Sequence, residues 1–129
     1  MMVIDSSAFV AIYQVEPERE AFEQALVGAR GLAMGGSAYL ETVMVLSRYS
    51  GSRNWFDTYV AGYDIRILPL DEPIARLAAD AFERYGRGRG HAARLNFGDC
   101  LSYAVAKSLD APLLYKGGDF ASTDVASAL

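Results

Sequence analysis

The sequence predicts an α/β fold in which a central, mostly parallel sheet lies between two layers of helices. Short apolar runs that end at turn residues are typical of buried parallel strands. Between these runs lie segments whose apolar residues recur every three or four positions, as in amphipathic helices. Strands that alternate with helices favour a three-layer α/β/α arrangement. The 129 residues, of which 52% are hydrophobic and 22% charged, suit one domain spanning residues 1–129.

The first half of the chain is expected to contain two strands and four helices. Met2-Val3-Ile4 is an apolar run that stops at Asp5, as expected where a buried strand is followed by a capped helix. Proline and acids at 16–18 are typical of the first turn of a helix. The helix expected after Ser37 has apolar positions at Leu40, Val43, Met44 and Leu46. The expected elements are strand 2–4, helix 8–13, helix 16–28, strand 32–34, helix 37–50 and helix 54–63.

The second half begins with the clearest strand of the chain. Residues 65–70 are predicted to form this strand, because β-branched residues dominate it and Pro69 stands at its end. Asp71 is expected to cap the next helix, whose apolar face contains Ile74, Leu77, Ala78, Ala81 and Phe82. The expected elements are strand 65–70, helix 72–85, a glycine- and arginine-rich loop at 87–94, helix 97–109, strand 112–115, a turn at 117–120 and an edge strand at 125–129.

Charge and cysteine content limit the function classes. Sixteen Asp and Glu against twelve Lys and Arg give a net charge of −4, which is unusual for a protein that binds a polyanion. Carboxylates that converge on bound cations would present the opposite sign to a substrate, so net charge does not decide the partner. The single cysteine, Cys100, excludes an intramolecular disulfide and favours a cytoplasmic location. No apolar run approaches the roughly 20 residues of a membrane span, and we expect no membrane association.

Four acidic residues stand where a parallel sheet binds ligands, which is at the carboxyl ends of its strands. Asp5 and Asp119 follow the first and fourth expected strands. Glu41 and Asp99 lie in the first turns of two expected helices. We therefore expect four acids from distant parts of the chain to meet at one edge of the sheet.

Such a cluster suits one or two hard divalent cations. Mg²⁺ prefers oxygen ligands, retains several waters and is held by only one or two direct carboxylates. A bound ion makes water a stronger nucleophile, and a second ion can stabilise the leaving oxygen of a phosphodiester displacement. The four acids therefore favour metal-dependent hydrolysis.

Each acid also has a purely structural interpretation, and the residues alone leave both interpretations open. Asp5 can cap the first helix. Glu41 and Asp99 can be first-turn acids that complement the helix dipole. Asp119 can be an ordinary turn residue after Gly118.

The segments that hold these acids resemble those of the PIN-domain ribonucleases, in particular the VapC-type toxins of toxin–antitoxin pairs. The likeness covers nearly the whole chain, and Asn96-Phe97-Gly98-Asp99 is its most specific part. Gly118 is a mild departure, since relatives often carry Asn or Asp there. The four matching segments are Val3-Ile4-Asp5-Ser6-Ser7-Ala8, Ser37-Ala38-Tyr39-Leu40-Glu41, Arg94-Leu95-Asn96-Phe97-Gly98-Asp99-Cys100 and Leu114-Tyr115-Lys116-Gly117-Gly118-Asp119-Phe120.

The resemblance implies roles for individual residues. It assigns Asp5, Glu41, Asp99 and Asp119 to a catalytic acidic quartet, with Asp5 and Asp99 as direct ligands of Mg²⁺ or Mn²⁺. Ser6 stands where the family has a small hydroxyl residue near the metal. The implied activity is endoribonuclease cleavage of a structured RNA such as transfer RNA. The implied partners are a second copy of the chain and a VapB-type antitoxin, through which alone the complex would bind DNA.

Basic residues near these segments are candidates for substrate contact. Arg87, Arg89 and Arg94 belong to the 87–94 loop and could neutralise backbone phosphates without reading bases. A merely solvated loop is an equally good interpretation. Lys116, beside the fourth acid, is a further candidate. His91 is the only histidine, and we expect it to be polar surface rather than a catalytic acid.

Three further features have mainly structural interpretations. Cys100 lies within an expected helix and is predicted to be a small buried hydrophobe. Trp55, Tyr59 and Tyr63 recur at a spacing of four and share one helical face, which favours a core or dimer face over base stacking. Asp124 is a candidate outer acid of the metal site, by resemblance only.

Two other function classes are alternatives: a binding module, and a different α/β phosphate enzyme such as a phosphatase or a receiver domain with an acceptor aspartate. A catalytically weak binding module would act mainly within a DNA-binding antitoxin complex, and intact acids at all four positions favour the enzyme. A phosphatase of the dehalogenase type needs a second aspartate two positions after the first, where this chain has Ser7. No Walker loop or dinucleotide fingerprint is present either.

Overall fold

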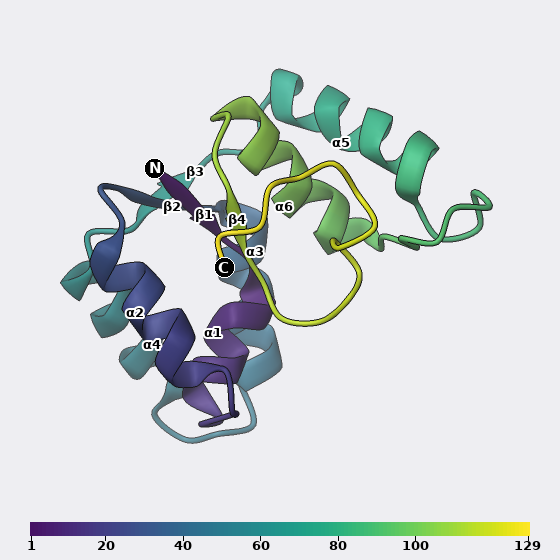
Figure 1. Cartoon of the computed structure of the whole chain (residues 1–129). Coiled ribbons are helices and arrows are strands. Elements are labelled where there is room, and N and C mark those ends of the chain that lie inside the picture. Colours follow the sequence, from purple (N-terminus) through teal and green to yellow (C-terminus); the bar gives the residue numbers. More distant parts are fainter.

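The computed structural model describes all 129 residues and contains a parallel sheet of four strands in the order β3-β2-β1-β4. In the register of the sheet, Val3 lies opposite Ala33 on one side and Leu113 on the other. Figure 1 shows helices on both sides of the sheet, so the predicted α/β class is confirmed. The strands are β1 (Met2–Ile4), β2 (Leu32–Gly35), β3 (Arg66–Leu68) and β4 (Leu113–Leu114).

Helices form two layers around this sheet. Helices α5 and α6 lie together on one side, and α1, α2 and α4 lie on the other (Figure 1). Helix α3 contacts α1 and α4 as well as α6, and so joins the two layers. The helices are α1 (Ser6–Tyr13), α2 (Arg19–Gly28), α3 (Gly36–Leu46), α4 (Ser52–Gly62), α5 (Glu72–Tyr85) and α6 (Phe97–Ser108).

The alternation of side chains along the strands divides the core in two. In β1, Val3 packs with the α5–α6 layer, whereas Met2 and Ile4 pack with the α1–α2–α4 layer. In β4, Leu113 and Leu114 divide in the same way. Successive side chains of a strand point to opposite faces, so an all-apolar strand builds both layers at once.

Side-chain caps fix where helices begin. Asp71 accepts a hydrogen bond from the backbone N–H of Ile74 at 3.1 Å and opens α5, as predicted. Asn96 accepts from the N–H of Asp99 at 2.8 Å, and the Asp99 carboxylate accepts from the N–H of Asn96 at 3.1 Å. This reciprocal capping box satisfies backbone donors that no helical carbonyl can reach.

Several predicted boundaries were wrong by a few residues, for local reasons. Helix α3 ends at Leu46 instead of residue 50, because the Ser52 hydroxyl binds the Leu46 carbonyl at 2.7 Å and Gly51, with φ of 81°, turns the chain. Helix α1 begins at Ser6 rather than residue 8, directly after its cap. Helix α2 begins at Arg19, after the proline and acids that were expected to form its first turn.

The predicted edge strand at 125–129 was also wrong. Only one parallel bridge forms there, in which the backbone of Leu113 binds Ala126 at 2.8 Å and Ala128 at 3.0 Å. The strand expected at 65–70 shortens to β3, since Pro69 has no N–H to continue the ladder.

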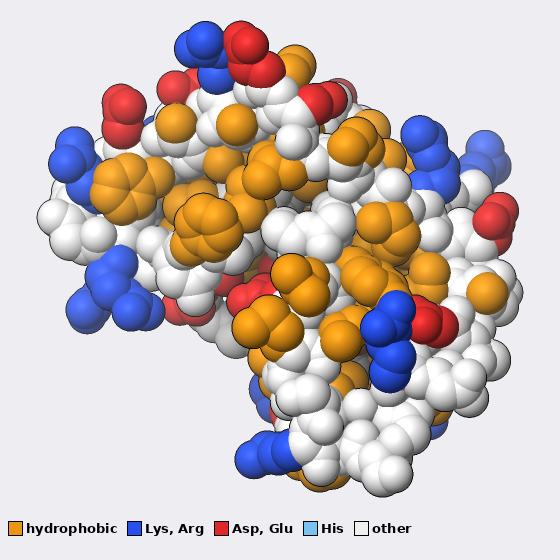
Figure 2. All heavy atoms as spheres, turned by 180° about the vertical axis from the view of Figure 1, so that it is seen from behind, with side chains coloured by type: hydrophobic (Ala, Val, Ile, Leu, Met, Phe, Trp, Pro, Cys, Tyr) orange, Lys and Arg blue, Asp and Glu red, His pale blue; other side chains and the backbone are white.

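Some residues predicted to be apolar core face solvent instead. In α3 the buried residues are Ala38, Thr42 and Leu46, whereas Leu40 and Met44 are 56% and 65% exposed. Figure 2 shows hydrophobic side chains gathered on the face that lies behind the sheet in Figure 1. None of the helices is both long and apolar enough to cross a membrane.

The fully buried Phe9 offers a test of the α1–α2–α4 layer. Its ring meets the Phe56 ring edge-on, with centroids 4.9 Å apart. We expect Phe9→Ala to lower the free energy of unfolding by about 3–5 kcal/mol through lost burial and the cavity left behind. Urea denaturation measures this loss, with Val27→Ala, at a position 74% exposed, as the surface control. A loss below about 1 kcal/mol would contradict the assigned packing.

Candidate active site

Asp5 stands at the carboxyl end of β1 and caps α1. Its Oδ2 accepts hydrogen bonds from the backbone N–H of Ser7 at 3.0 Å and from the Ser7 hydroxyl at 2.6 Å. The residue is only 3% exposed, and its Oδ1 is buried without any hydrogen-bond partner. The Asp5 side chain therefore caps α1 with one carboxylate oxygen and leaves the other oxygen without a partner.

Glu41 projects from α3 toward the beginnings of α1 and α6. Its Oε1 accepts a hydrogen bond of 2.6 Å from the Ser6 hydroxyl. A Cβ atom built on Gly98 would lie 2.9 Å from Glu41 Oε2 and 3.0 Å from Oε1. The carboxylate therefore lies directly against the first turn of α6, and the missing side chain of Gly98 permits this approach. Glu41 lies in the second turn of α3, not the first turn as expected.

Asp99 lies one residue beyond Gly98, in the first turn of α6 as predicted. Burial raises the pKa of Asp99 to about 6. The hydrogen bond from the backbone N–H of Asn96 acts in the opposite direction, because it favours the ionised form. The negative charges of Asp5, Asp119 and Glu41 raise the pKa further. Asp99 therefore lies within electrostatic reach of the other three acids.

Asp119 belongs to the exposed turn that follows β4. It is the most solvent-accessible of the four acids, since Asp5 is buried and Glu41 and Asp99 are half-buried. Red acidic side chains are recessed in a hollow between hydrophobic groups in Figure 2. No three His, Cys, Asp or Glu side chains lie close enough to form a complete metal site. The structure thus gathers the acids without a closed cage.

Residues 2–126 match the family model described as PIN domain. The chain is 43% identical over 129 residues to a ribonuclease VapC of Mycolicibacterium smegmatis, covering 98% of each protein. It is 41% identical over 130 residues to ribonuclease VapC28 of Mycobacterium tuberculosis, covering 99% of this chain and 98% of the relative.

The chain is a PIN-domain protein of the VapC family.

Solved structures share the fold at low sequence identity. VapC20 of Mycobacterium tuberculosis, described as a Sarcin-Ricin loop cleaving toxin, has a TM-score of 0.73 at 17% identity, over 97% of this chain and 96% of that one. A toxin–antitoxin complex from Klebsiella pneumoniae gives 0.74 at 16% identity, over 100% and 98%. FitAcB from Neisseria gonorrhoeae gives 0.70 at 20% identity, over 98% and 96%.

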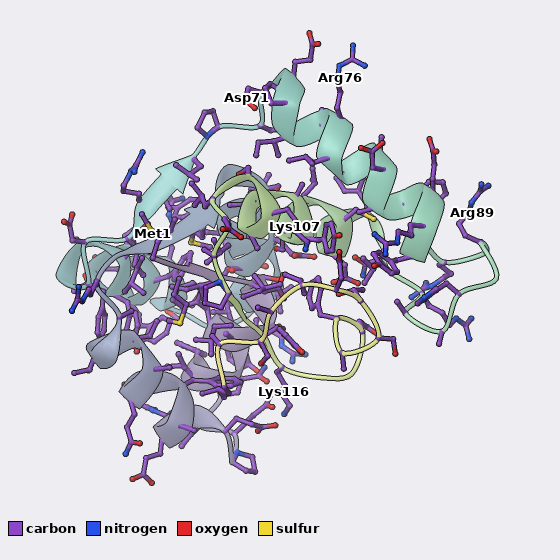
Figure 3. All side chains as sticks on the ribbon, turned by 45° about the horizontal axis from the view of Figure 1, so that its top comes forward. Met1, Asp71, Arg76, Arg89, Lys107 and Lys116 are labelled. Carbon is purple, nitrogen blue, oxygen red and sulfur yellow. The ribbon has the colours of Figure 1, made fainter.

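The basic candidates of this VapC-family chain lie in two different environments. Arg87, Arg89 and Arg94 are exposed in the loop between α5 and α6, and Figure 3 shows Arg89 pointing outward at its tip. Lys116 is ion-paired with Glu16, and its ammonium lies 3.4 Å from Glu18. The arginines are therefore free to meet a polyanion, whereas Lys116 is engaged within the fold.

Asp124 does not belong to the acidic cluster. Its carboxylate accepts a hydrogen bond of 2.5 Å from the Tyr103 hydroxyl and pairs with Lys107 at 3.2 Å and Arg84 at 3.6 Å. It is absent from the charges that act on Asp99. The interpretation as an outer acid of the metal site was therefore wrong, and Asp124 instead anchors the C-terminal segment to α5 and α6.

The remaining predictions concern single side chains. Cys100 is buried, as predicted, and burial raises the pKa of its thiol. The ring nitrogen Nδ1 of His91 accepts the backbone N–H of Ala93 at 3.0 Å, a bond within the loop. The rings of Trp55, Tyr59 and Tyr63 contact one another in sequence in tilted pairs, at centroid distances of 5.0 and 4.9 Å, and pack on the core, which agrees with the predicted shared face.

The sequence alone gave no role in the site to two residues, Ser7 and Gly98. Ser7 binds Asp5, and Gly98 makes room for Glu41. A serine two positions after a capping aspartate, and a glycine directly before a first-turn acid, were the available signals. Both are too common for a single sequence to single them out.

The raised pKa of Asp99 predicts a pH-dependent stability. The folded chain binds this proton more tightly than the unfolded chain, so the stabilising contribution is present in acid and is lost as the pH rises through about 6. In metal-free protein at about pH 7.5, we expect Asp99→Asn to melt roughly 2–5 °C above the wild type. Thermal melts in the presence of a chelator measure the difference, which should shrink toward about pH 4. If Asp99→Asn and the wild type had the same melting temperature at both pH values, the raised pKa of Asp99 would be contradicted.

Proposed function

We propose that this chain is a metal-dependent endoribonuclease toxin that acts in the cytoplasm and is inhibited by a cognate VapB-type antitoxin. Two observations carry the proposal: the negative charges of Asp5, Glu41 and Asp119 act on the half-buried Asp99, and one oxygen of Asp5 is buried without a hydrogen-bond partner. Relatives that align over almost the whole chain are named ribonucleases.

The donor set fits Mg²⁺ or Mn²⁺. Asp5 and Asp99 would hold the ion. Asp5 has an oxygen without a hydrogen-bond partner. Burial and the neighbouring acids raise the pKa of Asp99, and a bound cation would stabilise its ionised form. Sites for Mg²⁺ are typically completed by water and substrate phosphate around one or two carboxylates. A bound divalent ion supplies positive charge to the phosphodiester and makes water more acidic.

The other residues of the cluster handle water and protons. Glu41, held by the Ser6 hydroxyl, would orient the attacking water as a hydrogen-bond acceptor. Asp119 is exposed, so its carboxylate would contact water at the open side of the cluster. Ser6 is itself close enough to the cluster to donate to a phosphate oxygen when the bond to Glu41 opens.

The substrate is proposed to be a structured RNA such as transfer RNA. Arg87, Arg89 and Arg94 form an exposed basic loop at the beginning of α6, where they would neutralise backbone phosphates. Lys116 would contribute only where substrate displaces Glu16 and Glu18 from its ammonium. The description of the structural neighbour VapC20 as cleaving the sarcin–ricin loop supports a structured target.

Cleavage of RNA by the purified chain tests the proposal. With Mg²⁺ or Mn²⁺ and no antitoxin, we expect the wild type to cut cellular RNA at defined positions. Asp99→Asn should reduce the rate more than about 100-fold, since even partners of metal ligands typically contribute 10- to 100-fold. Sequencing of the fragment ends identifies the cleavage positions.

The alternative, a catalytically weak binding module, makes the opposite prediction for the same samples. It would leave RNA intact in wild type and Asp99→Asn alike, and calorimetry would detect no metal binding that depends on the acids. The unpaired oxygen of Asp5 favours the enzyme, because an inert scaffold gains nothing from burying it.

We further propose that a second copy of the chain covers the exposed apolar face of α3. This face consists of Leu40, Met44 and Val45 of α3, with Phe97 of α6 beside them, and these side chains are 56%, 65%, 47% and 81% exposed. They border a groove of about 530 Å³ that also contains Glu41. In a two-fold contact the same patch meets itself, so a patch without like charges is well suited to self-association.

The antitoxin is proposed to occupy a different face. A groove of about 760 Å³ along α2 is lined by exposed Val15 and Val27, together with three acids, Glu16, Glu20 and Glu23, and one base, Arg19, which pairs with Glu23 at 2.8 Å. Like charges would face each other if this surface paired with itself, whereas a partner with a basic segment would complement it. The Klebsiella neighbour is described as a toxin–antitoxin complex, which supports an antitoxin partner. A further neighbour is described as FitAB bound to an IR36 DNA fragment, which supports DNA contact by the complex.

Two charge insertions separate these faces. We expect Met44→Arg to convert a dimer into a monomer, because each copy would bring an unpaired cation into the apolar contact. Val27→Arg, at an equally exposed position of α2, should leave the dimer intact and weaken co-purification with the product of a neighbouring antitoxin reading frame. Light scattering after gel filtration measures the mass. A monomeric wild type, or a dimeric Met44→Arg variant, would contradict the assignment of the α3 face.

A further inference from the structure

The two oxygens of the Asp5 carboxylate have different surroundings. Oδ2 accepts both the backbone N–H and the hydroxyl of Ser7, at 3.0 and 2.6 Å. Oδ1 is buried and accepts no hydrogen bond. One oxygen is therefore committed to the beginning of α1, and the other is left without a partner.

The Ser7 hydroxyl also connects Asp5 to the opposite side of the cluster. A hydroxyl has one proton, which here is donated to Asp5, and its oxygen can accept in turn. That oxygen accepts the backbone N–H of Lys116 at 3.0 Å. Lys116 follows β4 in the segment that leads to Asp119, and Figure 3 shows its side chain on the side of the molecule where α1 and α2 meet. The hydroxyl thus links the carboxyl ends of β1 and β4.

The torsion of a carboxylate about its last bond is broad and nearly two-fold, so a carboxylate held by one hydrogen bond rotates easily. Removing the Ser7 hydroxyl would leave Oδ2 with the Ser7 N–H alone. It would also leave the half-buried Lys116 N–H without its acceptor. Both changes loosen the orientation of the free oxygen Oδ1.

The neighbouring serine does something different. The Ser6 hydroxyl donates to Glu41 at 2.6 Å and makes no bond to Asp5. Two consecutive hydroxyls at the beginning of α1 therefore hold two different carboxylates of the cluster.

We propose that Ser7 is a positioning residue that directs Asp5 Oδ1 toward the metal, an inference that rests on the metal-dependent function proposed above. Ser7 acts through Asp5 and touches neither ion nor RNA. Hydrogen-bond partners of metal ligands typically contribute 10- to 100-fold in metal affinity. The bond from Ser7 is short and made to a buried carboxylate, so a contribution in this range is expected.

Calorimetric titration of Mn²⁺ into metal-free protein, without RNA, tests the proposal. We expect Ser7→Ala to weaken Mn²⁺ binding about tenfold or more, and Ser7→Thr, which keeps a hydroxyl, to stay close to the wild type. Ser108→Ala is the matched control, since the Ser108 hydroxyl binds only the Val105 carbonyl at 2.8 Å, within α6. Should Ser7→Ala unfold, Ser7→Cys keeps the shape with a weaker donor and should show an intermediate loss.

The outcomes separate the positioning role from the function on which it rests. Wild-type affinity in folded Ser7→Ala, or in Ser7→Cys, overturns the positioning role, and so does a lowered melting temperature of the metal-free protein with unchanged Mn²⁺ affinity. Equal Mn²⁺ binding by the wild type and Asp5→Asn overturns the proposed function instead. A loss in Ser7→Ala that Ser7→Thr restores, with Ser108→Ala unchanged, supports the proposal.

Discussion

The burial of Asp99 among three other acids at one edge of the sheet is the constraint on which the rest of the structure depends. Burial and three negative neighbours raise the pKa of Asp99 to about 6, so the folded chain without a cation favours a proton there. A single flexible segment could relieve this repulsion by moving. The acids instead come from separate elements, β1, α3, α6 and the turn after β4, which two apolar layers hold in place.

Hydrogen bonds that engage only part of each carboxylate stabilise this arrangement. Asp5 receives Ser7 on one oxygen, Glu41 receives Ser6, and Asp99 receives the N–H of Asn96. These hydrogen bonds fix the orientation of the carboxylates. One buried oxygen of Asp5 remains without a hydrogen-bond partner, and it is the physical reason to expect a cation.

The surface distributes its remaining chemistry over different faces. Apolar side chains without charges gather on α3 and Phe97, acids border the groove along α2, and exposed arginines lie in the 87–94 loop. A net charge of −4 is therefore compatible with a polyanionic substrate, because the acids of α2 and the arginines of the loop lie on different parts of the surface. Three kinds of partner can each find a surface of suitable chemistry.

The sequence by itself determined the α/β class, the parallel strands, the bounds of α5 and the four acidic segments, because strand and helix periodicity and capping residues such as Asp71 are local signals. It did not determine which apolar residues of α3 are buried, since the periodicity of Leu40 and Met44 is the same for a core and for an exposed interface. Nor could it distinguish Asp124 from the acids of the cluster, or assign Ser7 to Asp5 and Ser6 to Glu41. Those pairings depend on where segments remote in sequence come to lie, and only the packed tertiary structure fixes that.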